Sequence, residues 1–224
     1  MNRNPPVRVK ICCIAGVEEA RLAISYGASA IGLVSAMPSG PGPIPENLIA
    51  AIAATVPPGI STFLLTSQQS ADGIVAQHSG THTNTIQIVD EFPPDQYDSL
   101  RKRLPAIKLV QVVHVLNEDA VDQALAVSAY VDAILLDSGN PRLSRKELGG
   151  TGRVHDWSIS TTIRENIRIP VYLAGGLRPD NVAEAIETVK PFAVDVCSGV
   201  RTNGKLDEEK LAGFFREVEQ AKTG

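Results

Sequence analysis

Two apolar segments of this sequence carry side chains that can exchange a proton. Val7–Ile14 contains Cys12 near its end, and Val131–Asp137 ends in Asp137. Both are short aliphatic runs, which is typical of buried parallel strands. In a chain of alternating strands and helices, the C-terminal ends of the strands form the rim that carries the active site. A thiol and a carboxyl on one rim indicate acid–base chemistry, in which one group takes a proton and the other gives one.

Each of these residues also has a purely structural interpretation. An unpaired cysteine is most often a small buried hydrophobe, and an aspartate that ends a strand can cap the following turn. From residue types alone, the structural interpretation of Cys12 is the stronger one. Its neighbour Cys13 is expected to point to the other face of the strand, into the helix layer, and to be inert. Cys197 is likewise expected to be structural.

Eight strand-like segments alternate with eight helical segments along the chain. Strands separated by helices pair in parallel through right-handed crossovers. Eight such units in 224 residues predict an α/β fold, a single (β/α)8 TIM barrel over residues 1–224, with a doubly wound open sheet as the alternative. The predicted strands are Val7–Ile14, Ala30–Ser35, Ile60–Thr66, Thr85–Val89, Ile107–Val113, Asp132–Asp137, Pro170–Ala174 and Phe192–Cys197. The predicted helices are Val17–Tyr26, Pro45–Thr55, Gln69–Ser79, Pro93–Arg103, Glu118–Ser128, Trp157–Glu165, Pro179–Thr188 and Asp207–Lys222.

Two long loops and two glycine-rich turns are expected on the same rim. Residues 36–44 (AMPSGPGPI) follow the second strand, and residues 138–156 follow the sixth and contain Gly149-Gly150-Thr151-Gly152. Loops of this length are usually functional. The turns at Gly175–Gly176 and Ser198–Gly199 follow strands seven and eight, where barrels of this kind bind phosphate through backbone N–H groups. The alternative is that these glycines only make tight turns.

Composition excludes several classes of function. The net charge of −4 gives no electrostatic case for binding nucleic acid. No apolar run approaches the roughly 20 residues of a membrane span, and the first ten residues lack the apolar core of a signal peptide. Three cysteines, an odd number, fit a reducing cytoplasm. No metal is expected, because His78 and His82 have no nearby acid or cysteine that would complete a ligand set.

Several ordered motifs resemble those of the phosphoribosylanthranilate isomerase family of tryptophan biosynthesis, over nearly the whole chain. The resemblance implies a (β/α)8 barrel that catalyses an Amadori rearrangement of a phosphosugar without a cofactor. The sequence leaves open whether it acts as a monomer or a homodimer. The segments that carry the resemblance are Val9–Cys12, Ile134–Ser138, Gly149–Gly152, Asp156-Trp157, Leu173–Val182 and Val194–Val200.

The resemblance also implies roles for individual residues. Cys12 is the expected general base, which removes a proton from ribose C2, and Asp137 is the expected general acid, which protonates the ring oxygen. Gly175, Gly176, Ser198 and Gly199 are expected to bind the substrate phosphate. A free thiol is mostly protonated at neutral pH, so Lys10, two residues upstream on the same strand face, is expected to favour the thiolate.

The sequence departs from the family pattern where the anthranilate moiety would bind. The family usually has a basic residue after strand two, but residues 36–44 contain no Lys or Arg. Strand four usually ends Gln-Leu-His-Gly, whereas this chain reads Gln87-Ile88-Val89-Asp90. Strand five usually carries a lysine, and Gln111 stands at about that place. A charge-assisted contact to a carboxylate contributes about 1.5–3 kcal/mol, so losing two such contacts would weaken anthranilate binding severely.

The basic loop after strand six is the expected source of a replacement cation. Its candidates are Arg142, Arg145, Lys146 and Arg153, and Arg153, Gly150, Gly152 and Lys10 are candidate substrate-binding residues. Asp90, His114 and His155 are further rim candidates by position. Two alternatives to the main interpretation stay open: a related aminoaldose–ketose isomerase acting on a different amine, and a non-catalytic barrel that binds a phosphosugar.

Overall fold

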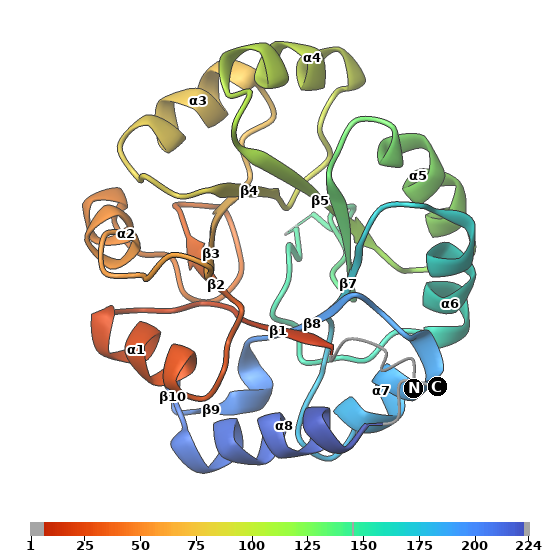
Figure 1. Ribbon diagram of the computed structural model, residues 1–224. Helices are drawn as coiled ribbons and strands as arrows, with labels where there is room; N and C mark the ends of the chain where they lie inside the picture. The colour runs from red at the N-terminus through yellow and green to blue at the C-terminus, as the bar shows by residue number, and fades with distance from the viewer. Residues whose placement is uncertain (1–6, 145, 222–224) are drawn as a thin grey trace.

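Eight parallel strands close into a barrel, each paired with its sequence neighbours and β1 with β8, and helices surround the barrel (Figure 1). The structure is a computed structural model that describes residues 7–144 and 146–221. The strands are β1 (Arg8–Ile11), β2 (Ala30–Val34), β3 (Ser61–Thr66), β4 (Thr85–Ile88), β5 (Lys108–His114), β6 (Ala133–Asp137), β7 (Val171–Leu173) and β8 (Ala193–Val196). The helices are α1 (Val17–Ser25), α2 (Glu46–Ala53), α3 (Ala71–Ser79), α4 (Pro94–Arg103), α5 (Asp119–Ser128), α6 (Trp157–Asn166), α7 (Val182–Val189) and α8 (Glu208–Gln220).

The predicted order of strands and helices is confirmed, and the open-sheet alternative is excluded by the closed barrel. A short 3-10 helix, η1 (Ser198–Val200), and a hairpin of β9 (Arg201–Thr202) and β10 (Lys205–Leu206) separate β8 from α8. The predicted end of the last helix, Lys222, lies outside the described residues. Among the described residues, no helix is long and apolar enough to cross a membrane.

The strands bury both faces, and successive residues alternate between two hydrophobic clusters. In β6, Ile134 and Leu136 belong to the larger cluster between the sheet and the helices. Ala133 and Leu135 belong to a smaller cluster inside the barrel. This alternation follows from the two-residue period of a strand. It decides which side chains of each strand can reach a site at the barrel mouth.

One ion pair lies inside the barrel between β1 and β8. Lys10 and Asp195 are direct partners in the strand register, and Lys10 Nζ lies 2.9 Å from Asp195 Oδ2. Lys10 is fully buried, and its ammonium also lies 5.2 Å from the centre of the Phe63 ring. Burial is the largest single influence and disfavours the charged lysine, but the charge and hydrogen bond of Asp195, together with the charges of Cys12 and Cys13, outweigh it and raise the pKa of Lys10. The structure therefore holds a permanent positive charge beneath the mouth.

Candidate active site

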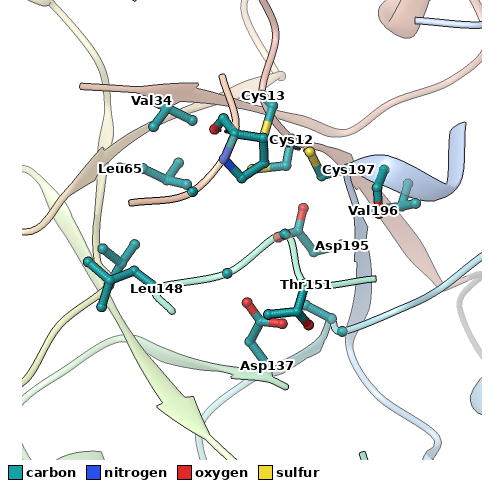
Figure 2. A pocket seen from close by; sticks show the side chains of 18 of the residues that line it. Cys12, Cys13, Val34, Leu65, Asp137, Leu148, Thr151, Asp195, Val196 and Cys197 are labelled. Carbon is teal, nitrogen blue, oxygen red and sulfur yellow. Dashed lines mark hydrogen bonds between the residues drawn. The ribbon is translucent and has the colours of Figure 1, made fainter. Parts of the chain in front are cut away.

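A pocket opens at the C-terminal end of the barrel, where Cys12 and Asp137 lie on opposite sides of it (Figure 2). Asp195 points into the space between them. The predicted meeting of a thiol and a carboxyl on one rim is therefore what the structure shows. The residues that line the pocket are Cys12, Cys13, Val34, Met37, Gly40, Pro41, Leu65, Gln87, Val89, Leu135, Asp137, Leu148, Gly149, Gly150, Thr151, Gly152, Ala174, Gly175, Gly176, Leu177, Asp195, Val196, Cys197 and Ser198.

The surroundings of Cys12 favour its thiolate. A hydrogen bond from the Cys13 thiol lowers the pKa of Cys12. Burial and the negative charge of Asp195 oppose this effect, whereas the positive charge of Lys10 and the backbone of Cys13 strengthen it. The lowering effects prevail, so the pKa of Cys12 lies below that of an ordinary cysteine. The expectation that Lys10 assists is confirmed, and a second contributor, Cys13, was not foreseen.

Cys13 does not point into the helix layer, so the prediction that it is inert there is wrong. β1 ends at Ile11 rather than Ile14, and Cys13 has the left-handed φ of 61°. This conformation breaks the alternation of the strand, because successive side chains point to opposite faces only in extended backbone. Cys13 and Cys197 therefore both line the pocket beside Cys12. The pattern of an apolar strand gave no signal of this turn.

The carboxyl of Asp137 is held at the end of β6 by its neighbours. Its Oδ1 accepts a hydrogen bond from the backbone N–H of Ser138 at 2.7 Å. The loop after β6 passes so close that a Cβ at Gly149 would lie 2.8 Å from Oδ2. Gly149 also has a φ of 138°, a conformation that side chains rarely adopt. The glycine thus lets the loop cover a carboxyl oxygen that faces the pocket.

The two rim loops meet over the pocket. A Cβ at Gly150 would lie 2.4 Å from Cδ of Pro41, so the loops of residues 36–44 and 138–156 are in direct contact there. Thr151 Oγ1 and Ser138 Oγ are 2.8 Å apart and close the longer loop onto the end of β6. Gly150 and Gly152 line the pocket, in agreement with their predicted place.

The turns after β7 and β8 lie side by side. Gly175 and Gly176 have positive φ values of 82° and 64°. A Cβ at Gly199 would lie 1.9 Å from the carbonyl oxygen of Leu177, so only glycine allows the two turns to approach this closely. Gly175, Gly176 and Ser198 line the pocket. Gly199 supports the approach of the turns from behind.

None of the described residues that line the pocket is a Lys, Arg or His. Two cations of the loop after β6 are already paired: Arg153 with Glu147, and Lys146 with Asp90, whose oxygen lies 2.5 Å from Lys146 Nζ. Arg142 lies beside a separate groove between α4 and α5. Arg145 lies outside the described residues.

Gln111 does not occupy the place predicted for it. It points away from the barrel interior, where Tyr97 Oη donates to its Oε1 at 2.7 Å and its Nε2 donates to the carbonyl of Asp90 at 2.9 Å. The inward positions of β5 are Val110 and Val112. A displacement of one residue in a strand exchanges its two faces. Because Gln111 points outward, the two inward positions beside it, Val110 and Val112, are apolar.

Gln87 is a pocket residue that sequence reasoning passed over as a binding group. It lies on the inner face of β4, is 3% exposed and lines the pocket. Its Oε1 is buried and has no hydrogen-bond partner within the described structure. A buried unpaired amide oxygen is costly, so it marks a place where a bound molecule can donate a hydrogen bond. Strand alternation alone would have placed Gln87 inward.

The histidines lie outside the pocket lining. His155 sits behind Gly175, and its Nε2 lies 2.7 Å from Ser160 Oγ; burial lowers its pKa, while Asp137 and Asp156 oppose that shift. His114 Nε2 lies 3.0 Å from the carbonyl oxygen of Val89. His78 bonds the carbonyl of Thr83. No group of three or more potential metal ligands occurs among the residues that the structure describes.

The fold is that of (β/α)8-barrel enzymes, whose active sites lie at this rim. A family model described as N-(5'-phosphoribosyl)anthranilate (PRA) isomerase matches residues 9–217. The chain belongs to that family. It is therefore an aldose–ketose isomerase of tryptophan biosynthesis, as its resemblance predicted.

Individual relatives agree with this assignment. The chain is similar to N-(5'-phosphoribosyl)anthranilate isomerase 2 of Methanosarcina mazei, with 38% identity over 214 residues that cover 95% of this chain and 94% of the relative. Its structure is similar to that of the Thermotoga maritima isomerase, with a TM-score of 0.82, 32% identity and coverage of 96% and 99%. A further isomerase structure, in complex with reduced 1-(o-carboxyphenylamino)-1-deoxyribulose 5-phosphate, has a TM-score of 0.80, 30% identity and the same coverage.

Proposed function

We propose that Cys12 and Asp137 carry out an Amadori rearrangement of N-(5-phosphoribosyl)anthranilate to 1-(2-carboxyphenylamino)-1-deoxyribulose 5-phosphate. The observation that carries the proposal is their position on opposite sides of one pocket. A base and an acid placed across a substrate can act on two different atoms of it. A non-catalytic binder would need neither group.

Asp137 acts first as the general acid. It donates a proton to the ribose ring oxygen, the bond between that oxygen and C1 breaks, and the anilino nitrogen stabilises the positive charge as an iminium. Cys12 then removes the proton from C2, which gives an enolamine that relaxes to the ketose. The low pKa of Cys12 supports the base role, because a thiolate is the form that accepts a proton.

The phosphate of the substrate binds between the turns after β7 and β8. Gly175, Gly176 and Ser198 bring backbone to this side of the pocket, Gly199 lets the two turns approach each other, and backbone N–H groups suit an anion. The buried ion pair of Lys10 and Asp195 contributes no exposed charge, so the phosphate relies on backbone donors. Lys10 acts on Cys12 through its charge rather than by contact with the substrate.

The aromatic ring of anthranilate binds against the apolar part of the pocket, and Lys146 receives its carboxylate. Lys146 lies with Pro41, Gly149 and Gly150 in a depression next to the pocket mouth. Asp90 is almost fully buried and fixes the ammonium of Lys146. The side chains that offer apolar contact are Met37, Pro41, Leu65, Val89 and Leu148.

A pair of variants tests this assignment. Lys146→Met should raise KM for phosphoribosylanthranilate at least about tenfold, because a charge-assisted contact contributes about 1.5–3 kcal/mol. Arg153→Met is the matched control from the same loop, because Arg153 lines a separate depression beside His155 and not the one that holds Lys146. A larger effect in Arg153→Met than in Lys146→Met would transfer the role to Arg153.

The activity itself is tested with purified protein and in a tryptophan auxotroph that lacks the isomerase. Wild type should rescue growth and reach a kcat/KM of roughly 10⁴ M⁻¹s⁻¹ or above. Cys12→Ala and Asp137→Asn should each lower turnover about 10²-fold or more without unfolding the protein. A poor wild-type kcat/KM would favour an isomerase of a different amine. Binding of the substrate without turnover would favour a phosphosugar-binding protein.

We further propose that residues 1–224 form one domain that works in a reducing cytoplasm. The three cysteines are free thiols in the structure, which fits such a compartment. A solved relative from Thermotoga maritima is described as dimeric. Sedimentation of the purified chain decides between monomer and homodimer.

A further inference from the structure

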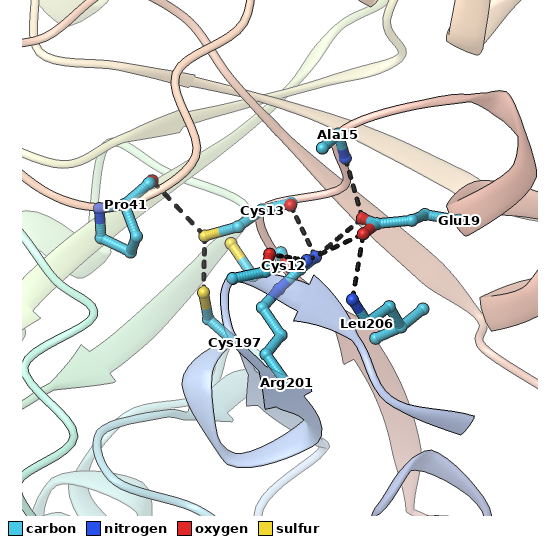
Figure 3. A network of polar contacts seen from close by, with 9 residues as sticks. Cys12, Cys13, Ala15, Glu19, Pro41, Cys197, Arg201 and Leu206 are labelled. Atoms are coloured by element: carbon cyan, nitrogen blue, oxygen red, sulfur yellow. Dashed lines mark hydrogen bonds and ion pairs between the residues drawn. The ribbon is translucent and has the colours of Figure 1, made fainter. Parts of the chain in front are cut away.

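Two thiols of the rim touch each other across the boundary between β1 and β8. Cys13 follows β1 and Cys197 follows β8, and their Sγ atoms are 2.7 Å apart (Figure 3). A disulfide bond is about 2.05 Å long. The sulfur atoms therefore need to approach each other by less than about 1 Å to form one.

The backbone of Cys13 is fixed in the conformation that makes this contact. Arg201 Nη2 donates to the carbonyl oxygen of Cys13 at 2.6 Å and to that of Cys12 at 3.3 Å. Glu19 holds the same guanidinium at 3.0 Å, and its carboxylate also accepts the backbone N–H groups of Ala15 and Leu206 (Figure 3). This network keeps Cys13 at its left-handed φ, with its side chain in the mouth.

Both sulfurs can be reached by a small oxidant. Cys13 and Cys197 line the pocket that receives the substrate, and Cys197 is only partly buried. Arg201 lies close to both cysteines: burial lowers the pKa of its guanidinium, and Glu19 together with the two cysteines raises it. The thiolate is the form of a cysteine that reacts with a hydroperoxide.

We propose that Cys13 and Cys197 are a redox-active pair, which a hydroperoxide converts to a disulfide that reversibly inactivates the neighbouring base Cys12. The Cys197 thiolate attacks the terminal oxygen of hydrogen peroxide and becomes a sulfenic acid, with release of one water. The Cys13 sulfur then attacks the Cys197 sulfur and displaces the second water. Two electrons pass from the two sulfurs to the peroxide, and both thiol protons end in water.

The link to activity follows from the hydrogen bond between Cys13 and Cys12. The Cys13 thiol lies 3.6 Å from the carbonyl oxygen of Pro41, to which it can donate, and it is also the largest influence that lowers the pKa of Cys12. A disulfide removes the proton of this thiol, so that influence on Cys12 is lost. The disulfide also draws together two walls of the pocket. Activity at a pH on the acid limb of the kcat/KM profile should therefore fall at least about tenfold on oxidation, which corresponds to about one pKa unit. This part of the inference rests on the proposed role of Cys12.

The test treats wild-type protein with hydrogen peroxide and measures its intact mass, its crosslinked peptides and its activity before and after dithiothreitol. The expected result is a loss of two hydrogen atoms, a crosslink to Cys197, and activity that dithiothreitol restores. Cleavage after Lys10 and Arg21 leaves Cys12 and Cys13 in one tryptic peptide. The mapping is therefore repeated with Cys12→Ser, in which only Cys13 can make the crosslink, or by fragmentation of the wild-type peptide between the two residues.

Cys197→Ser is the matched control, and each variant is compared with its own reduced form. It should form no crosslink and should lose much less of the activity that dithiothreitol restores, because the reversible oxidation that remains is that of Cys12 or Cys13 to a sulfenic acid. Absence of a Cys13–Cys197 crosslink in oxidised wild type overturns the proposal, as does reversible inactivation of undiminished extent in Cys197→Ser. The crosslink is measured without any substrate, so a failure of the proposed function would leave that readout intact.

Discussion

The thiol of Cys13 should set the pH at which the enzyme becomes active. Replacing it by alanine removes the hydrogen bond that is the largest influence lowering the pKa of Cys12. A net hydrogen bond to a charged group contributes about 1.5–3 kcal/mol, and a thiol is a weak donor. The low end of that range corresponds to about one pKa unit.

The expected result in Cys13→Ala follows from the sign of this change. A raised pKa of Cys12 leaves less thiolate at low pH, so the acid limb of the kcat/KM profile should move up by about one unit. At a pH on that limb, kcat/KM should fall about tenfold, while the plateau at high pH stays near that of wild type. The charge of Lys10 remains in the variant, so the limb should not return to that of an ordinary thiol.

The assay is kcat/KM for phosphoribosylanthranilate between about pH 5 and pH 9. Cys13→Ser is the control, because its hydroxyl retains a donor at the same place and should keep the limb near its wild-type position. An unchanged limb in Cys13→Ala would show that the donor does not act on Cys12. An equal loss of kcat/KM at every pH would instead indicate altered packing around the pocket. It would also refute the argument that the Cys13 thiol acts by lowering the pKa of Cys12.

Three further outcomes are expected. Lys10→Met should lower the free energy of unfolding, measured in urea, by about 3–5 kcal/mol, because it leaves the buried carboxylate of Asp195 unpaired; the Lys10→Met/Asp195→Leu double variant should lose less, and equal losses would contradict this account. Burial lowers the pKa of His155, so below about pH 6.5 the unfolded chain binds a proton at this residue that the folded chain does not. The contribution of neutral His155 to the free energy of unfolding is therefore fully present above that pH and is lost as the pH falls. His155→Gln should therefore show a flatter decline of stability between about pH 7 and pH 5, and identical slopes would argue against it. Crystals grown in sulfate should hold the ion between the turns at Gly175–Gly176 and Ser198–Gly199, and an ion bound only elsewhere on the rim would count against that phosphate site.

Much of the fold was predictable from the sequence because its signals are local. Runs of aliphatic residues with helical segments between them, in strict alternation, determine a parallel sheet. Eight repeats of the unit favour closure into a barrel. The residues at the strand ends, Cys12 and Asp137, then follow by counting along each segment. That both residues lie on the same rim can be predicted without knowing any individual side-chain contact.

The inner and outer faces of the strands were only partly predictable. Gln111 was placed at the mouth, but it points toward Tyr97 in the helix layer. Gln87, whose unpaired oxygen faces the pocket, was not recognised as a binding group. A shift of one residue in a strand exchanges its two faces. An error of one residue in placing a strand therefore leaves the predicted fold unchanged, but it reverses the prediction of which side chains face the pocket.

The group around Cys12 was decided by the tertiary structure. The sequence determined that a thiol and a lysine stand on the first strand of a barrel and a carboxyl on the sixth. It did not determine that Cys13 turns back toward the mouth, because that turn is stabilised by Arg201 and Glu19, more than 180 residues apart in the chain. Nor did it determine that Lys146 pairs with Asp90, which lies 56 residues away. Such contacts form because the closed barrel brings loops together that are far apart in the chain. The local periodicity of a sequence predicts helices and strands, but it does not predict which distant side chains will meet.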